Sequence, residues 1–311
     1  MFNHEIEHIE YIERDERITM KLLIFGGGGM LGHKLAQQFR DKFDVWTTVR
    51  GRAADYAAFD LLRPERMIEG VDAEDAGGVR NAIEMVNPDV VINAVGIIKQ
   101  LPSAGDVIKT LEINSIFPNR LAELAREFGF RLICISTDCV FDGLNGNYTE
   151  DSVPNAFDLY GKSKNLGEVA GENCLTLRTS IIGRELGTSH SLVDWFLSNR
   201  GKKVKGFVNA IYSGFPTIVF ADIIASLITD HPKLHGLYHV SSKPINKFDL
   251  LQMVRKYYEA DIEIEPDTDF RIDRSLDSSR FRKETGFQPL DWEEMVRRMA
   301  ADPTPYDKWK R

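Results

Sequence analysis

Residues 21–40 read KLLIFGGGGMLGHKLAQQFR, and this stretch decides the fold. A short apolar run at 21–25 precedes four glycines, and an amphipathic pattern at 30–40 follows them. The apolar run predicts a buried strand and the pattern predicts a helix. Glycine between the two lets the backbone turn tightly and approach a pyrophosphate at the helix N-terminus. This unit is typical of a nucleotide-binding α/β fold.

The glycine run fits two spacings. Gly27, Gly29 and Gly32 give G-x-G-x-x-G, whereas Gly26, Gly29 and Gly32 give G-x-x-G-x-x-G. A glycine run by itself is a weak signal, and its position between a strand and a helix makes it specific.

Outward from this unit, apolar runs alternate with helical patterns as far as about residue 183. The alternation predicts a Rossmann-like, doubly wound parallel sheet followed by a smaller, mixed α/β substrate lobe. The expected strands are 45–49, 68–72, 90–96, 131–137 and 175–181, and the expected helices are 76–86, 113–128 and 160–170. Further helices are expected at 191–199, 220–228, 247–258 and 291–299, with a strand at 236–242 and a loop or small helix at 51–68.

The chain has 311 residues, 43% of them hydrophobic, which allows one or two domains. We expect an N-terminal extension at 1–19 without stable structure, a Rossmann domain at 20–180 and an interleaved substrate lobe at 181–311. The net charge of −8 argues against nucleic acid as a partner. No apolar run approaches the roughly 18 residues of a membrane helix, so we expect a cytoplasmic protein with no membrane partner. Three cysteines without metal-like spacing predict reduced thiols and no metal site.

The end of the second expected strand bears on the choice of cofactor. An acidic residue there would bind the ribose 2′-hydroxyl of NAD, but this strand ends at Arg50, with Arg52 close behind. Because a guanidinium can grip a 2′-phosphate with two hydrogen bonds, the sequence favours NADP(H), with NAD(H) as the alternative.

Tyr160 and Lys164 lie four residues apart, which places them on one face of the expected helix 160–170. A lysine ammonium near a phenol stabilises the phenolate and lowers its pKa, so that the tyrosine can act as an acid or base near neutral pH. Upstream, Ser136 and Thr137 end the expected strand 131–137, and ligands bind at that end of strands in open α/β sheets. One of these two hydroxyls can hold a substrate carbonyl beside the tyrosine.

In this order, the stretches FGGGGMLG, PDVVINAVG, STDCVFDG, YGKSKNLGE and LDSSRFRKETGF resemble the extended short-chain dehydrogenases/reductases. Within them they are most similar to the dTDP-4-dehydrorhamnose reductase (RmlD-like) group, from about residue 22 to residue 298. The resemblance implies an NAD(P)H-binding Rossmann lobe, a C-terminal lobe that binds a nucleotide-diphospho sugar, and reduction of a 4-keto-6-deoxy sugar for a surface polysaccharide.

The resemblance also implies roles for individual residues. Thr137 would hydrogen-bond the 4-keto oxygen, Tyr160 would protonate it, and Lys164 would lower the tyrosine pKa and bind the nicotinamide ribose. The remaining cofactor contacts would be Gly26, Gly29, Met30, Leu31 and Gly32 at the pyrophosphate, Arg50 at the 2′-phosphate, Asp72 and Ala73 at the adenine, and Ala94, Val95 and Gly96 at the adjacent ribose and phosphate. Asp72 matches the family's spacing better than Asp60, although it can equally cap a strand end.

One departure from the family pattern is Cys139, where an aromatic residue is usual, so the substrate-facing wall differs. Lys99 and Arg184 are candidate diphosphate contacts. Two alternative activities remain within the same family, a 4-epimerase and a 4-dehydratase. The dehydratase is disfavoured because such enzymes usually have an acid pair after the Ser/Thr, and here no glutamate follows Asp138. A different class also stays open: an NADP-binding regulatory subunit like the β subunit of methionine adenosyltransferase. A homodimer is compatible with all of these.

Overall fold

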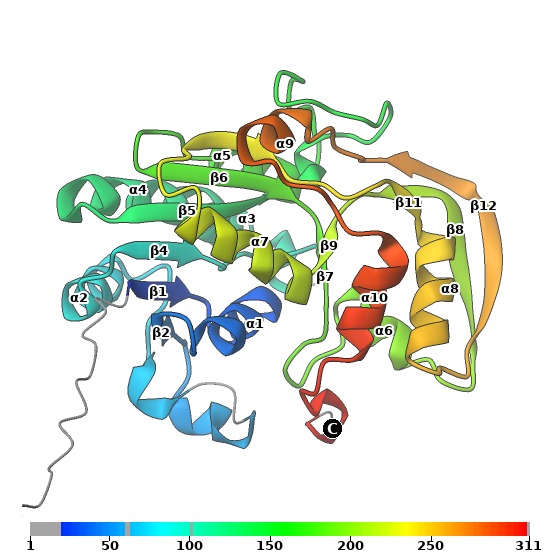
Figure 1. The fold of residues 1–311 in the computed structure, drawn as a ribbon, viewed down its shortest axis with the longest axis horizontal. Helices are drawn as coiled ribbons and strands as arrows, with labels where there is room; N and C mark the ends of the chain where they lie inside the picture. Colours follow the sequence, from blue (N-terminus) through cyan, green and yellow to red (C-terminus); the bar gives the residue numbers. More distant parts are fainter. Residues whose placement is uncertain (1–19, 60–62, 100–101, 310–311) are drawn as a thin grey trace, which may run out of the picture.

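The computed structural model describes residues 20–59, 63–99 and 102–309, so the extension at 1–19 lies outside the described residues. Seven parallel strands form the main sheet in the order β10-β6-β5-β4-β1-β2-β3 (Figure 1). They are β1 (Lys21–Phe25), β2 (Asp44–Thr48), β3 (Met67–Ile68), β4 (Val90–Asn93), β5 (Arg131–Thr137), β6 (Cys174–Thr179) and β10 (Gly236–His239). The order reverses between β1 and β4, and ligands bind at such a reversal, outside the carboxyl ends of the strands.

Alternate side chains of β1 face two apolar layers. Leu22 and Ile24 pack with helices α1 (Met30–Phe39) and α7 (Thr217–Thr229), whereas Leu23 and Phe25 pack with α2 (Ala76–Val86) and α4 (Phe117–Phe128). All four β1 side chains are buried, as expected for a parallel strand covered on both faces. The predicted Rossmann-like fold is therefore confirmed.

Three predicted elements differ from the structure. The expected helix 113–128 is three pieces: α3 (Val107–Leu111), a π-helical turn (Glu112–Ile116) and α4. The expected helix 160–170 is the shorter α5 (Leu159–Leu166), because Gly167 ends it and packs so tightly that a Cβ there would lie 1.9 Å from the Asn114 carbonyl oxygen. The expected strand 68–72 shrinks to the two residues of β3.

The second half of the chain completes the main sheet and adds a smaller one (Figure 1). Strand β10 lies in the second half of the chain yet pairs with β6, so that half contributes a strand to the main sheet. The smaller sheet has the order β11-β8-β12, and a further pair joins β7 to β9. The elements are β7 (Ile181–Ile182), α6 (Leu192–Leu197), β8 (Lys203–Tyr212), β9 (Phe215–Pro216), β11 (Ile245–Asn246), α8 (Lys247–Tyr257), β12 (Glu263–Asp273), α9 (Ser279–Thr285) and α10 (Trp292–Ala300).

The expected loop 51–68 holds two 3₁₀ turns, η1 (Ala53–Phe59) and η2 (Pro64–Arg66). Asp60 lies between them, outside the described residues. Within the described ranges, none of the helices has the length and apolar character needed to cross a membrane.

Candidate active site

The glycine turn has the shape that a pyrophosphate site needs. Gly26 adopts a positive φ of 89°, and Gly29 forms the N-cap of α1 without a side-chain cap. A Cβ on Gly32 would lie 2.0 Å from the Gly26 carbonyl oxygen, so only glycine lets the helix start this close to the strand. Met30 and Leu31 open α1, where the first N–H groups of a helix have no partner within it.

The segment after β4 lies against this turn. A Cβ on Gly26 would meet the Val95 side chain at 3.0 Å and the Ala94 carbonyl oxygen at 3.2 Å. A Cβ on Gly96 would lie 4.0 Å from the Lys164 ammonium nitrogen. The structure thus brings the predicted pyrophosphate, ribose and lysine positions together at one edge of the sheet.

The predicted adenosine end is more open. Asp72 accepts a hydrogen bond from the Glu74 N–H at 3.0 Å, which is the capping role considered as its alternative, and Ala73 is buried beside it. Arg50 follows β2 and is exposed. Its neighbour Arg52 is engaged with Asp55 at 3.3 Å. Arg50 is therefore the better placed of the two arginines to meet a phosphate.

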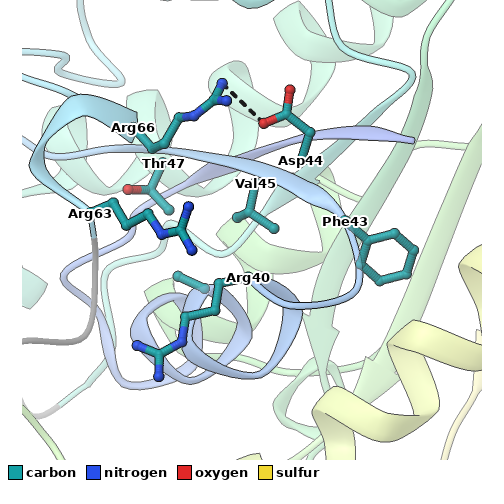
Figure 2. A pocket seen from close by; sticks show the side chains of 8 residues that line it. Arg40, Phe43, Asp44, Val45, Thr47, Arg63 and Arg66 are labelled. Carbon is teal, nitrogen blue, oxygen red and sulfur yellow. Dashed lines mark ion pairs between the residues drawn. The ribbon is translucent and has the colours of Figure 1, made fainter. Parts of the chain in front are cut away.

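A hollow lies along β2, which lines it from Asp44 to Thr47 (Figure 2). Arg40, Arg63 and Arg66 also line it, and Arg66 pairs with Asp44 at 3.0 Å.

Thr137 and Tyr160 meet at the carboxyl end of β5. The Thr137 hydroxyl accepts a hydrogen bond from the Cys139 N–H and lies 3.1 Å from the Asp138 carboxylate. Burial raises the pKa of the Tyr160 phenol above its usual value, the charges of Cys139 and Asp138 raise it further, and hydrogen bonding with Thr137 opposes them. The predicted lowering of this pKa by Lys164 is thus not seen: burial is the main cause of the shift, and the Lys164 ammonium is directed to the Ile135 carbonyl oxygen. Tyr160 stays protonated at neutral pH.

Lys164 donates a hydrogen bond to the Ile135 carbonyl oxygen at 2.7 Å, and burial lowers its pKa. Asn114 lies in the π-helical turn nearby and holds the Ile97 N–H and carbonyl oxygen with its amide. It also reaches the Ser163 hydroxyl at 3.2 Å. Sequence reasoning missed Asn114, because a π turn is invisible in a helical pattern; such turns often mark functional sites.

Ser136 does not face the tyrosine. Its hydroxyl donates to the Glu168 carboxylate at 2.6 Å, and Glu168 forms two 2.7 Å hydrogen bonds with Arg178. This pair is almost fully buried, and His239 lies 3.2 Å from Arg178. Of the two hydroxyls considered, Thr137 alone is therefore placed to hold a substrate carbonyl.

The two candidate diphosphate contacts, Lys99 and Arg184, lie in different surroundings. Lys99 pairs with Asp158 at 2.7 Å, and its ammonium nitrogen lies 5.5 Å from the centre of the Tyr160 ring. Arg184 is buried, with ion pairs to Asp194 and Asp307. These ion pairs already neutralise the Arg184 charge within the fold, so of the two candidates Lys99 is the better placed to meet a diphosphate.

A doubly wound parallel sheet, a glycine turn at its reversal point and a Thr-Tyr-Lys set at the same edge together define an extended short-chain dehydrogenase/reductase. The family model named RmlD substrate binding domain matches residues 20–304, and the chain belongs to that family. A curated relative, dTDP-4-dehydrorhamnose reductase of Aggregatibacter actinomycetemcomitans, is 25% identical over 90% of this chain and 98% of its own.

Two further proteins are similar to the chain. Methionine adenosyltransferase 2 subunit beta of Xenopus tropicalis is 26% identical over 78% of this chain and 73% of its own. The crystal structure of dTDP-4-dehydrorhamnose reductase from Bacillus anthracis in complex with NADP has a TM-score of 0.75 at 20% identity. That match covers 90% of this chain and 98% of the other.

Proposed function

We propose that the protein is an NAD(P)H-dependent reductase of a nucleotide-diphospho-4-keto-6-deoxy sugar. The observation that carries the proposal is the placement of Thr137 next to the Tyr160 phenol at the carboxyl end of β5, the sheet edge that also holds Lys164 and the glycine turn. The similarity to a dTDP-4-dehydrorhamnose reductase along nearly its whole length supports the same conclusion.

The residues present fit a dinucleotide. A Cβ at position 32 would collide with the Gly26 carbonyl oxygen, so Gly32 lets the start of α1 lie directly against the turn. The N-terminus of α1 has no side-chain cap, so it offers N–H groups and a positive dipole to a pyrophosphate. Lys164, next to Gly96, would hold the nicotinamide ribose. Exposed Arg50 would hold the 2′-phosphate, which makes NADP(H) the preferred cofactor and NAD(H) the alternative.

Bound cofactor would supply a hydride to sugar C4. As negative charge develops on the C4 oxygen, the Thr137 hydroxyl would donate a hydrogen bond to it and Tyr160 would transfer its phenolic proton. A raised pKa suits this role, because the tyrosine must be protonated before it can act as an acid. Fixed hydroxyl donors need no reorganisation as the charge forms, which is the source of such electrostatic catalysis.

Lys99 supports an anionic substrate. It is partly exposed beside the Tyr160 ring and, after releasing Asp158, can approach a diphosphate. We place the reaction in the cytoplasm, where nucleotide sugars are made for surface polysaccharides, and we propose a homodimer with no nucleic-acid or membrane partner.

The test is mass spectrometry of products after incubation with NADPH and a panel of dTDP- and UDP-4-keto-6-deoxy sugars. We expect a gain of two hydrogens in one of them, with matching loss of absorbance at 340 nm. Conversion without net consumption of NADPH would indicate a 4-epimerase instead.

The second candidate is an NADP-binding regulatory subunit, and the similarity to methionine adenosyltransferase 2 subunit beta favours it. The intact Thr137–Tyr160–Lys164 set does not by itself exclude a regulatory subunit, so the test must be biochemical. Cofactor binding without turnover of any sugar in the panel, together with co-purification of a synthetase, would support the subunit.

A further inference from the structure

The last described residues, 302–309, leave α10 and end near α6 (Figure 1). They cross from the substrate side of the molecule to α1, the helix that begins at the glycine turn. Asp302 forms an ion pair with Lys34, whose side chain is 3% exposed, and Thr304 accepts a 2.8 Å hydrogen bond from the Gln37 amide. We call residues 302–309 the C-terminal strap.

Tyr306 is the most buried residue of the strap, and it is the one that reaches toward the glycine turn. Its residue is 3% exposed, and its hydroxyl lies 2.8 Å from Nε2 of His33, which is fully buried. Nδ1 of His33 lies 2.8 Å from the carbonyl oxygen of Gly29, the residue that caps α1. Two short contacts therefore connect the strap to the cofactor turn.

The direction of both hydrogen bonds follows from chemistry. Burial lowers the pKa of His33 to about 4, so the imidazole is neutral and carries one N–H. The Gly29 carbonyl can only accept, so the proton must be on Nδ1, and Nε2 must be the acceptor. Tyr306 therefore donates to Nε2. The hydroxyl fixes the tautomer that lets His33 hold the Gly29 carbonyl.

The Gly29 carbonyl also accepts the His33 main-chain N–H at 3.0 Å, and the Gly29 N–H donates to the Gly26 carbonyl at 2.9 Å. The carbonyl is thus the point where the turn becomes a helix. An imidazole hydrogen-bonded to this carbonyl restricts the orientation of the Gly29–Met30 peptide. The N–H of that peptide opens α1, where we propose that the pyrophosphate binds.

We propose that Tyr306 is a positioning residue for the cofactor: acting through His33, it holds the glycine turn in the shape that binds the dinucleotide. The inference rests on the proposed cofactor site. It means that the C-terminal strap contributes to nucleotide affinity without touching the nucleotide.

The test uses Tyr306→Phe in the full chain, which removes one hydroxyl and keeps the ring. Its matched control is Tyr258→Phe: the Tyr258 hydroxyl donates to the Met299 carbonyl oxygen at 3.1 Å and makes no hydrogen bond to α1 or the glycine turn among the described residues, and its ring, which packs on Arg184, is kept. Direct titration with NADPH, followed by its fluorescence, gives the Kd, and thermal unfolding with and without NADPH gives an independent measure. We expect Tyr306→Phe to raise the Kd roughly three- to tenfold, as loss of one buried hydrogen bond predicts.

With saturating NADPH, kcat and the KM for the sugar should stay at their wild-type values, because a positioning role in cofactor binding does not reach them. His33→Asn supplies a second variant: it can still donate to Gly29 but cannot reach Tyr306, and it should raise the Kd to a similar extent. Equal Kd values for wild type, Tyr306→Phe and His33→Asn would overturn the proposal, as would an equal rise in Tyr258→Phe. If the wild-type chain bound neither NADPH nor NADH, the proposed function itself would fail.

Discussion

The cofactor end of this site is shaped by the backbone, whereas its substrate end is formed by ionisable side chains. At the glycine turn, Gly32 lies so close to the Gly26 carbonyl oxygen that no Cβ would fit between them. At the Thr137–Tyr160 end, buried ionisable side chains make it, surrounded by Asp138, Cys139 and Lys164. Cofactor binding should therefore depend on the shape of the backbone, and catalysis on the protonation states of a few side chains.

The largest effect should come from Tyr160→Phe, which separates the two ends. We expect kcat to fall by roughly 10²- to 10⁴-fold, the usual contribution of a general acid. NADPH affinity should change little, because the glycine turn is untouched. The measurements are steady-state kinetics and NADPH titration of the same preparation, and near-normal turnover would exclude Tyr160 as the acid.

The two ends share one vulnerability, since each holds a buried neutral histidine. Burial lowers the pKa of His33 and of His239 to about 4, and at His239 the Arg178 charge adds to this effect. Protonation is thus harder in the folded state than in the unfolded state, whose histidines titrate near pH 6.5. Their contribution to stability is complete above pH 6.5 and is lost as the pH falls toward 4, by up to about 3 kcal/mol each.

Urea unfolding at pH 7 and pH 4.5 measures this loss. The difference in the free energy of unfolding between the two pH values should shrink in His239→Gln and remain in His235→Gln, which changes an exposed histidine. An unchanged difference in His239→Gln would show that acid destabilisation arises elsewhere.

Gly32→Ala tests the claim that shape governs the cofactor end. The new methyl group cannot fit 2.0 Å from the Gly26 carbonyl oxygen, so the turn or the helix must shift. We expect the Kd for NADPH to rise roughly ten- to a hundredfold, given the close helix–strand packing that this glycine serves. The control is Gly105→Ala, where a Cβ would have no neighbour within 4 Å. Equal affinities in the two variants would contradict a backbone-built site.

The same contrast explains what the sequence could predict. The turn was predictable because its signal is local: glycines at fixed spacing between a strand and a helix. The Thr137, Tyr160 and Lys164 positions were predictable because each has a fixed place on a strand end or a helix. The residues alone could not decide between Ser136 and Thr137, because the partner of Ser136, Glu168, lies 32 residues away and is held by Arg178.

Other features had no local signal at all. Asn114 reaches Ile97 and Ser163 only because a π turn rotates it inward. Arg184 looked like an exposed cation, but it is buried and one of its ion-pair partners, Asp307, lies more than a hundred residues later. The pKa of Tyr160 was predicted in the wrong direction, because a motif shows the nearby lysine but not the burial that opposes it.

The smallest expected effect concerns the open adenosine end, where neither backbone shape nor burial restricts the ligand. Arg50→Ala should lower the preference for NADPH over NADH, measured as the ratio of the two kcat/KM values, by roughly tenfold, the loss expected for a charge-assisted hydrogen bond at an exposed site. Arg52→Ala is the matched control, because Asp55 already engages that side chain. An unchanged ratio in Arg50→Ala would assign the 2′-phosphate to other groups. A loss in Arg52→Ala alone would show that the Arg52–Asp55 ion pair opens when the nucleotide binds and that Arg52, not Arg50, meets the 2′-phosphate.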